Sequence, residues 1–142
     1  MAGLDNSVKC WRTALHATVT ALIVAIPGLA ITPVAHAAAA TATLSVEHTW
    51  QTGFIAHFTV ANSSAVPLND WKLEFDLPVG ESVSHTWNST LVQSGTHYVL
   101  TPANWNRIIA PGGSATGGLR GVLTGSYSPP SNCVFNGQYR CT

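Results

Sequence analysis

The alternation of residues from 71 to 77 constrains the fold of this chain more than any other feature. In this segment, WKLEFDL, the odd positions are large and apolar and the even positions are charged. A period of two is typical of a β-strand, whose successive side chains point to opposite faces of a sheet. One face of such a strand is buried and the other meets water, as in many antiparallel sheets. We therefore expect Trp71 to lie in a hydrophobic core.

The sequence after residue 37 shows further short apolar alternations and no convincing helical period. Glycine, proline and asparagine residues mark turns between these runs. Besides 71–77, the strands that we expect lie at residues 44–50, 54–60, 83–87, 96–101, 118–123 and 133–135. We therefore predict an all-β fold, an antiparallel sandwich of about seven to nine strands.

The first 37 residues have the features of a signal peptide. Lys9 and Arg12 precede an apolar run, and Ala35-His36-Ala37 has the small-x-small pattern of a cleavage site. We expect a secreted, extracellular protein that is cleaved after Ala37 or within the next alanines and has no membrane association afterwards. The chain would then consist of a signal peptide (1–37), a short Ala-rich lead-in (38–43) and a binding module (44–142).

Two alternatives to this cleavage stay open. A transmembrane anchor would retain the apolar run, although Pro27-Gly28 interrupts it and no stop-transfer charges follow. Cleavage before His36 would expose an N-terminal histidine that could bind copper, as in a copper monooxygenase, but Pro33 disfavours that cut. N-terminal sequencing of the secreted protein distinguishes these alternatives from cleavage after Ala37.

The low charge of the chain excludes some partners. The formal net charge is zero and charged residues make up 8% of the sequence. Nucleic-acid binding is disfavoured, because it needs a basic patch that neutralises phosphates. A surface rich in serine, threonine, asparagine and glycine suits a neutral partner such as a polysaccharide. We also expect a monomer that carries no cofactor.

Two cysteines remain after the signal peptide, which contains Cys10. In an oxidising compartment Cys133 and Cys141 are expected to form a disulfide, and two free thiols are the alternative. Asn136-Gly137 between them is a strong hairpin signal. A two-residue turn would leave the sulfurs on opposite faces, whereas a three-residue loop with a bulge would place the cysteines opposite each other. A disulfide therefore predicts the bulged hairpin.

The stretch from 81 to 106 carries tryptophans in an unusual setting. Trp87 and Trp105 are each followed by asparagine and surrounded by small polar residues, and Trp50 has a similar setting upstream. Indoles in such surroundings are expected at the surface, where they are a solubility liability unless they bind something. We predict that the three rings form a face that stacks on sugars, whose C–H faces are flat and apolar.

From Leu44 to Cys141 the chain resembles the family 2 carbohydrate-binding modules of bacterial cellulases, xylanases and chitinases. The segments that carry the resemblance are WQTGF, NDWKLEFDLP, HTWNSTLVQSG, ANWNRIIAPGGS and NGQYRC. The resemblance implies an immunoglobulin-like jelly-roll sandwich without catalytic activity. It also implies that Trp50, Trp87 and Trp105 are coplanar and bind insoluble β-1,4-linked polysaccharide, cellulose or chitin. The whole chain is similar to small secreted actinobacterial proteins that carry this module alone, some labelled possible chitinase.

Details of the sequence refine this resemblance. Xylan-binding members have an arginine three residues after the first tryptophan and lack the middle one, whereas this chain has Gly53 and Trp87. These features resemble the cellulose- and chitin-binding branch. The family also joins its two ends by a disulfide, but this chain has no cysteine near Thr41 and has Cys133 where an apolar residue is usual.

The polar residues beside the tryptophans are the other expected binding residues. The family places hydrogen-bonding asparagine and glutamine there, which implies such a role for Asn88 and Asn106. Histidines occupy three of these positions: His48, His57 and His85. Imidazole either replaces the amide as a hydrogen-bonding partner or makes binding depend on pH, because histidine titrates near neutrality.

Other functions are weighed against sugar binding. A chitinase-like or other polysaccharide-active hydrolase needs two carboxylates, and Glu74 and Asp76 share a strand face. A solvated strand face that also carries Lys72 explains them better. A metal site could draw on the three histidines above and His97, but their spacing is not compact. A surface adhesin could use the same aromatic row against host glycans. We expect neither a catalytic nor a metal site.

Overall fold

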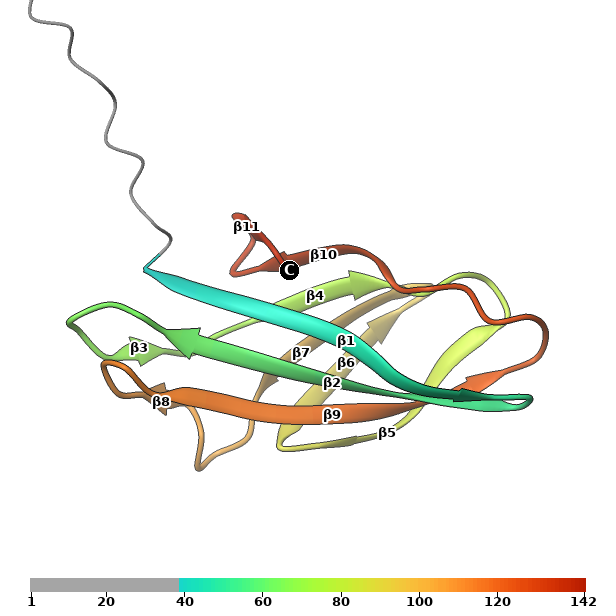
Figure 1. Cartoon of the computed structure of the whole chain (residues 1–142), viewed down its shortest axis with the longest axis horizontal. Coiled ribbons are helices and arrows are strands. Elements are labelled where there is room, and N and C mark those ends of the chain that lie inside the picture. The colour runs from blue at the N-terminus through green and yellow to red at the C-terminus, as the bar shows by residue number, and fades with distance from the viewer. Residues whose placement is uncertain (1–38) are drawn as a thin grey trace, which may run out of the picture. The chain divides into compact units, whose positions relative to one another are not determined.

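The computed structural model describes residues 39–142, which form strands joined by turns and loops (Figure 1). The strands are β1 (Ala40–Trp50), β2 (Gly53–Asn62), β3 (Leu68–Asn69), β4 (Leu73–Asp76), β5 (Glu81–Trp87), β6 (Ser89–Ser94), β7 (His97–Pro102), β8 (Ile108–Ile109), β9 (Ser114–Leu123), β10 (Ser131–Phe135) and β11 (Tyr139–Arg140). The predicted all-β fold is confirmed. No helix in the described part of the chain is long and apolar enough to cross a membrane.

Two antiparallel sheets form the sandwich, with the core between them. The first sheet has the strand order β1-β2-β9-β5 and the second β11-β10-β4-β7-β6, while β3 and β8 form a small ladder (Figure 1). Alternate residues of β2, such as Phe54 and Phe58, face the core, as do Leu73 and Phe75 of β4. Trp71 is fully buried, as expected, with its ring 5.4 Å from that of Phe58. The period of two thus places the core as predicted.

The first strand begins earlier than the sequence suggested. We expected residues 38–43 to be a lead-in, but β1 starts at Ala40, which pairs with Asn62 of β2. Ala40 and Ala42 are buried and alternate with exposed Thr41. Alanine occurs on both buried and exposed faces, so the sequence did not predict that β1 begins at Ala40. The predicted signal peptide and the alternatives to its cleavage lie outside the described residues.

Four strands escaped the sequence analysis. β6 pairs along its length with β7, where we had expected only a connection through Gln93-Ser94-Gly95. Its polar residues follow no clear apolar alternation, because β6 lies at the edge of its sheet and most of it is solvent-exposed. The other three, β3, β8 and β11, have two residues each. Residues 39–142 therefore contain eleven strands rather than seven to nine.

The C-terminal hairpin has the predicted three-residue loop, and its two cysteines are bonded. Residues 136–138 form its loop, because Phe135 pairs with Tyr139, and Cys133 is bonded to Cys141 with their Cα atoms 5.3 Å apart. The amide of Cys141 donates to the carbonyl oxygen of Cys133. Closing so short a loop contributes about 2.5 kcal/mol in the chain-entropy model. The disulfide thus fastens the end of the chain to β10.

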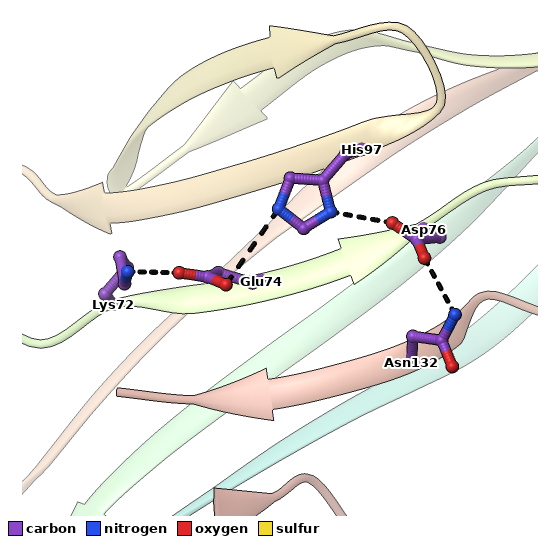
Figure 2. A network of polar contacts seen from close by, with 5 residues as sticks. All are labelled: Lys72, Glu74, Asp76, His97 and Asn132. Atoms are coloured by element: carbon purple, nitrogen blue, oxygen red, sulfur yellow. Dashed lines mark hydrogen bonds and ion pairs between the residues drawn. The ribbon is translucent and has the colours of Figure 1, made fainter. Parts of the chain in front are cut away.

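A polar network covers part of the outer face of the five-stranded sheet (Figure 2). Nδ1 of His97 lies 2.7 Å from Oδ1 of Asp76, and Nδ2 of Asn132 donates to Oδ2 of the same carboxylate at 2.8 Å. Glu74 is ion-paired with Lys72, and its second oxygen lies 3.9 Å from Nε2 of His97. The network joins β4, β7 and β10 across the sheet.

This network predicts a dependence of stability on acid. The hydrogen bond from Asn132, followed by that with His97, holds the pKa of Asp76 below its ordinary value of 3.8. A carboxylate whose pKa is lower in the folded state than in the unfolded state stabilises the fold at pH values above the unfolded-state pKa. This stabilisation is lost as the pH falls through the folded-state pKa. Thermal unfolding is therefore measured at several pH values from about 5 to about 2. The unfolding midpoint temperature should fall less over this range for Asp76→Asn than for the wild type. Equal slopes for the two proteins would contradict the assignment.

Candidate functional site

The outer face of the four-stranded sheet brings together most of the residues singled out in the sequence. Because Phe54, Ala56 and Phe58 of β2 point into the core, the residues between them point outward. Pairing then extends this face over the other strands in three cross-strand rows: Trp50–Gly53–Val122–Ser82, His48–Ile55–Arg120–His85 and Ser45–His57–Gly118–Trp87. Two of the predicted tryptophans and all three histidines therefore share one face.

Each of these two tryptophan rings lies against a glycine of the neighbouring strand. A β-carbon on Gly118 would lie 2.2 Å from Cζ2 of Trp87, and one on Gly53 would lie 2.6 Å from Cζ2 of Trp50. Only a residue without a side chain leaves room for a ring so close to the backbone. Trp50 and Trp87 are accordingly half-buried rather than fully exposed, which differs from the simple surface position we expected.

Neighbouring polar groups surround the two rings. Nε1 of Trp50 donates to Oγ1 of Thr52 at 3.1 Å, and the guanidinium of Arg120 lies 5.7 Å from the centre of the same indole. The ring of His57 meets that of Trp87 edge-on at 5.4 Å. Contacts of this kind restrict the tilt of an aromatic ring and stabilise it. The tryptophans are therefore held in place before any ligand arrives.

Trp105 lies in the loop between β7 and β8 and is 71% exposed. The next residue, Asn106, is buried, and its Nδ2 donates to the carbonyl oxygen of Asn88 at 2.8 Å. Its own carbonyl oxygen accepts a hydrogen bond from Nε1 of Trp71. Asn106 thus ties this loop to the residue after Trp87 and to the core.

The side chains of both asparagines bond to the backbone near the tryptophans. Asn88 has a positive φ of 60° and its Nδ2 donates to the carbonyl oxygen of Thr116. Asparagine tolerates this left-handed backbone better than most residues. The side chains of Asn88 and Asn106 thus position the end of β5, where Trp87 lies, and the loop that carries Trp105. Contact of either asparagine with a ligand stays a prediction.

The histidines are split between the two sheets. His48 and His85 lie in one row on either side of Arg120 and are exposed, while His57 is paired with Glu47 at 3.2 Å. His97 belongs to β7 of the other sheet. Among residues 39–142, no group of three or more histidine, cysteine, aspartate or glutamate side chains could hold a metal ion.

Sequence reasoning missed Arg120, the only arginine of the glycine-rich strand β9. A single charged residue within GGLRG would have been a usable signal, because glycine removes the side chains that could otherwise cover it. Register alone shows that it stands between His48 and His85. The outer face therefore carries a fixed positive charge beside the first tryptophan.

A cavity of about 430 Å³ opens beside Trp105, and the sequence analysis did not anticipate it. Its lining residues are Asn69, Asp70, Asn104, Trp105, Arg107 and Ile108. Arg107 donates from Nε to Oδ1 of Asp70 at 2.9 Å, and its Nη2 lies 2.7 Å from the same oxygen. Trp105, the most exposed of the three predicted tryptophans, thus has a hollow at its side.

Comparison with known proteins gives a consistent result. A family described as "Cellulose binding domain" matches residues 40–141. A protein of Mycobacterium tuberculosis (strain ATCC 25618 / H37Rv) named Cellulose/chitin binding protein is 80% identical over 142 residues, 100% of both chains. Chitinase C of Streptomyces lividans is 39% identical over 124 residues, covering 87% of this chain and 19% of the chitinase. The solution structure of the chitin-binding domain of Chi18aC from Streptomyces coelicolor aligns with a TM-score of 0.61 and 38% identity, covering 73% of this chain and 96% of that domain.

Proposed function

Because the chain belongs to the cellulose-binding domain family, we propose that it is a secreted, non-catalytic protein that adsorbs to insoluble β-1,4-linked polysaccharide. Cellulose and chitin are the two candidate solids. Trp50, Trp87 and Trp105 are the proposed contact residues. Two of its relatives are a cellulose/chitin binding protein and a chitinase, and these names support both polymers as ligands.

The observation that carries this proposal is the glycine under each of two indoles. Trp50 and Trp87 each pack against the backbone at Gly53 or Gly118 and stay partly exposed, so the ring surface that remains open, beside Arg120 in the case of Trp50, is left for a ligand. A pyranose ring presents a flat C–H face that an indole covers well. If one stack removes about 100 Å² of apolar surface from water, it contributes about 2.5 kcal/mol before ordering costs. Several such stacks would hold a rigid glycan chain.

The hydrolase alternative has less support. A glycosidase needs two carboxylates on either side of the scissile bond. The two candidates on β4 are already engaged, Glu74 with Lys72 and Asp76 with His97 and Asn132. They also lie on the five-stranded sheet, whereas Trp50 and Trp87 lie on the four-stranded one.

The adhesin alternative is tested together with the main proposal. The secreted protein is mixed with microcrystalline cellulose, with chitin and with a non-glycan solid of similar particle size, and the unbound fraction is measured. Adsorption to either polysaccharide, without release of soluble sugar, supports the proposal. Adsorption to neither polysaccharide would contradict the proposal. That result is the one expected of an adhesin, because a surface that recognises only a host partner has no reason to bind these solids.

A further inference from the structure

We propose that the cavity beside Trp105 is a subsite for the 2-acetamido group of chitin, an inference that rests on the proposed function. Cellulose and chitin have the same backbone and similar ring faces, so stacking on tryptophan cannot separate them. They differ at C2, where cellulose has a hydroxyl and chitin an acetamido group. A residue that selects chitin must therefore recognise an amide and a methyl group at the side of a stacked sugar. The cavity lies at the side of the most exposed indole.

The carboxylate of Asp70 supplies an oriented hydrogen-bond acceptor. Both contacts from Arg107 go to Oδ1, and no residue from 39 to 142 donates a hydrogen bond to Oδ2. The backbone amide of Asp70 donates to the carbonyl oxygen of Arg107 at 3.0 Å, so main chain and side chain are both held. Because Asp70 lines the cavity, its Oδ2 is available to accept the N–H of an acetamido group. Hydrogen bonds to an ionised group are about twice as strong as those between neutral groups.

Donors for the acetamido carbonyl also line the cavity. The guanidinium of Arg107 has five N–H groups, and two of its nitrogens are engaged with Oδ1 of Asp70. Asn69 and Asn104, whose side-chain amides can donate, also line the hollow. An amide ligand, which donates through nitrogen and accepts through oxygen, would find both kinds of partner here.

An apolar wall completes the match. Ile108 lines the cavity and is 67% exposed, although its neighbour Ile109 is buried in the core. An isoleucine so exposed contributes little to packing, but it offers aliphatic surface to an acetyl methyl group. A C2 hydroxyl has no methyl group to place against such a wall. The arrangement therefore favours chitin over cellulose.

The test compares adsorption isotherms on chitin and on cellulose for the full secreted chain and its variants. Asp70 has a φ of 52°, a backbone conformation that asparagine accepts readily, so Asp70→Asn preserves the loop. Its amide oxygen can still accept from Arg107, which turns the amide nitrogen toward the cavity and replaces an acceptor by a donor. We expect affinity for chitin to fall about tenfold, the loss of one charge-assisted hydrogen bond, with affinity for cellulose unchanged. Ile108→Ser should reduce chitin binding alone by about threefold.

Controls separate this inference from the proposed function. Glu74→Gln removes the same charge from the five-stranded sheet and should leave both isotherms unchanged. Unfolding midpoints of all variants exclude a loss of fold as the cause. Equal losses on both solids, or no loss on either in Asp70→Asn, would overturn the subsite while leaving the proposed function intact. A wild-type protein that adsorbs to neither solid would overturn the proposed function itself.

Discussion

Replacing Trp87 with alanine is expected to lower the affinity for the polysaccharide surface by about 70-fold, the equivalent of one stacked ring at about 2.5 kcal/mol. The free energy of unfolding should fall by only about 1 kcal/mol, because the ring is half-buried and lies at the end of β5. Adsorption isotherms and chemical denaturation measure the two quantities separately. The prediction is therefore a large loss of binding in a protein that remains folded.

Two further variants control for this result. Tyr139→Ala removes an aromatic ring that is 44% exposed on β11 of the other sheet, and it should leave adsorption unchanged. Gly118→Ala keeps the indole but places a β-carbon 2.2 Å from Cζ2 of Trp87 and 2.6 Å from the carbonyl oxygen of Ala56, so the ring must move. If ring orientation matters, this variant should lose affinity too. Unchanged binding in Trp87→Ala would refute the proposed contact.

Replacing Trp71 with alanine is expected to act on the fold. Trp71 is fully buried, packs against Phe58, and donates from Nε1 to the carbonyl oxygen of Asn106 at 3.0 Å. Loss of a buried tryptophan costs about 3–5 kcal/mol, a large fraction of the roughly 5–15 kcal/mol that stabilises a typical domain. Chemical denaturation should show a greatly reduced or absent unfolding transition.

Trp71→Phe is the matched control. It retains most of the apolar volume but removes the hydrogen bond that holds the carbonyl oxygen of Asn106. We expect a smaller loss, about 1–3 kcal/mol for the unsatisfied buried carbonyl, with the transition still cooperative. An unfolding free energy that does not change in Trp71→Ala would show that the core does not depend on this residue.

The contrast between these tryptophans shows how far local pattern reaches. Trp71 begins an alternating apolar segment, and its burial follows from that pattern. Trp87 and Trp105 stand among polar residues, but only Trp105 is largely exposed. Trp87 is half-buried because Gly118 lies beneath it, and this pairing joins β5 to the distant strand β9. A local pattern does not predict such a contact.

The asparagines make the same point for polar residues. The sequence around Asn106 indicates a surface loop, and amides beside exposed indoles suggest ligand contact. In the fold Asn106 is buried, bonded to Asn88 and to Trp71, and therefore holds the loop. Likewise Arg120 gains its place between two histidines from strand register alone. Whether a polar side chain meets ligand or backbone depends on distant segments.

The sequence by itself determined the all-β class and the buried face of β4, and it predicted the three-residue loop of the C-terminal hairpin on the condition that Cys133 and Cys141 are bonded. Each depends on near neighbours along the chain, either through the two-residue period of a strand or through covalent geometry in a short loop. Only the tertiary structure decided which glycine supports each indole, which asparagines hold the loops, and that Asp70, Arg107 and Ile108 line one cavity beside Trp105. These contacts join strands and loops far apart in sequence, and long-range register has no local signature because it is selected by packing of the whole core.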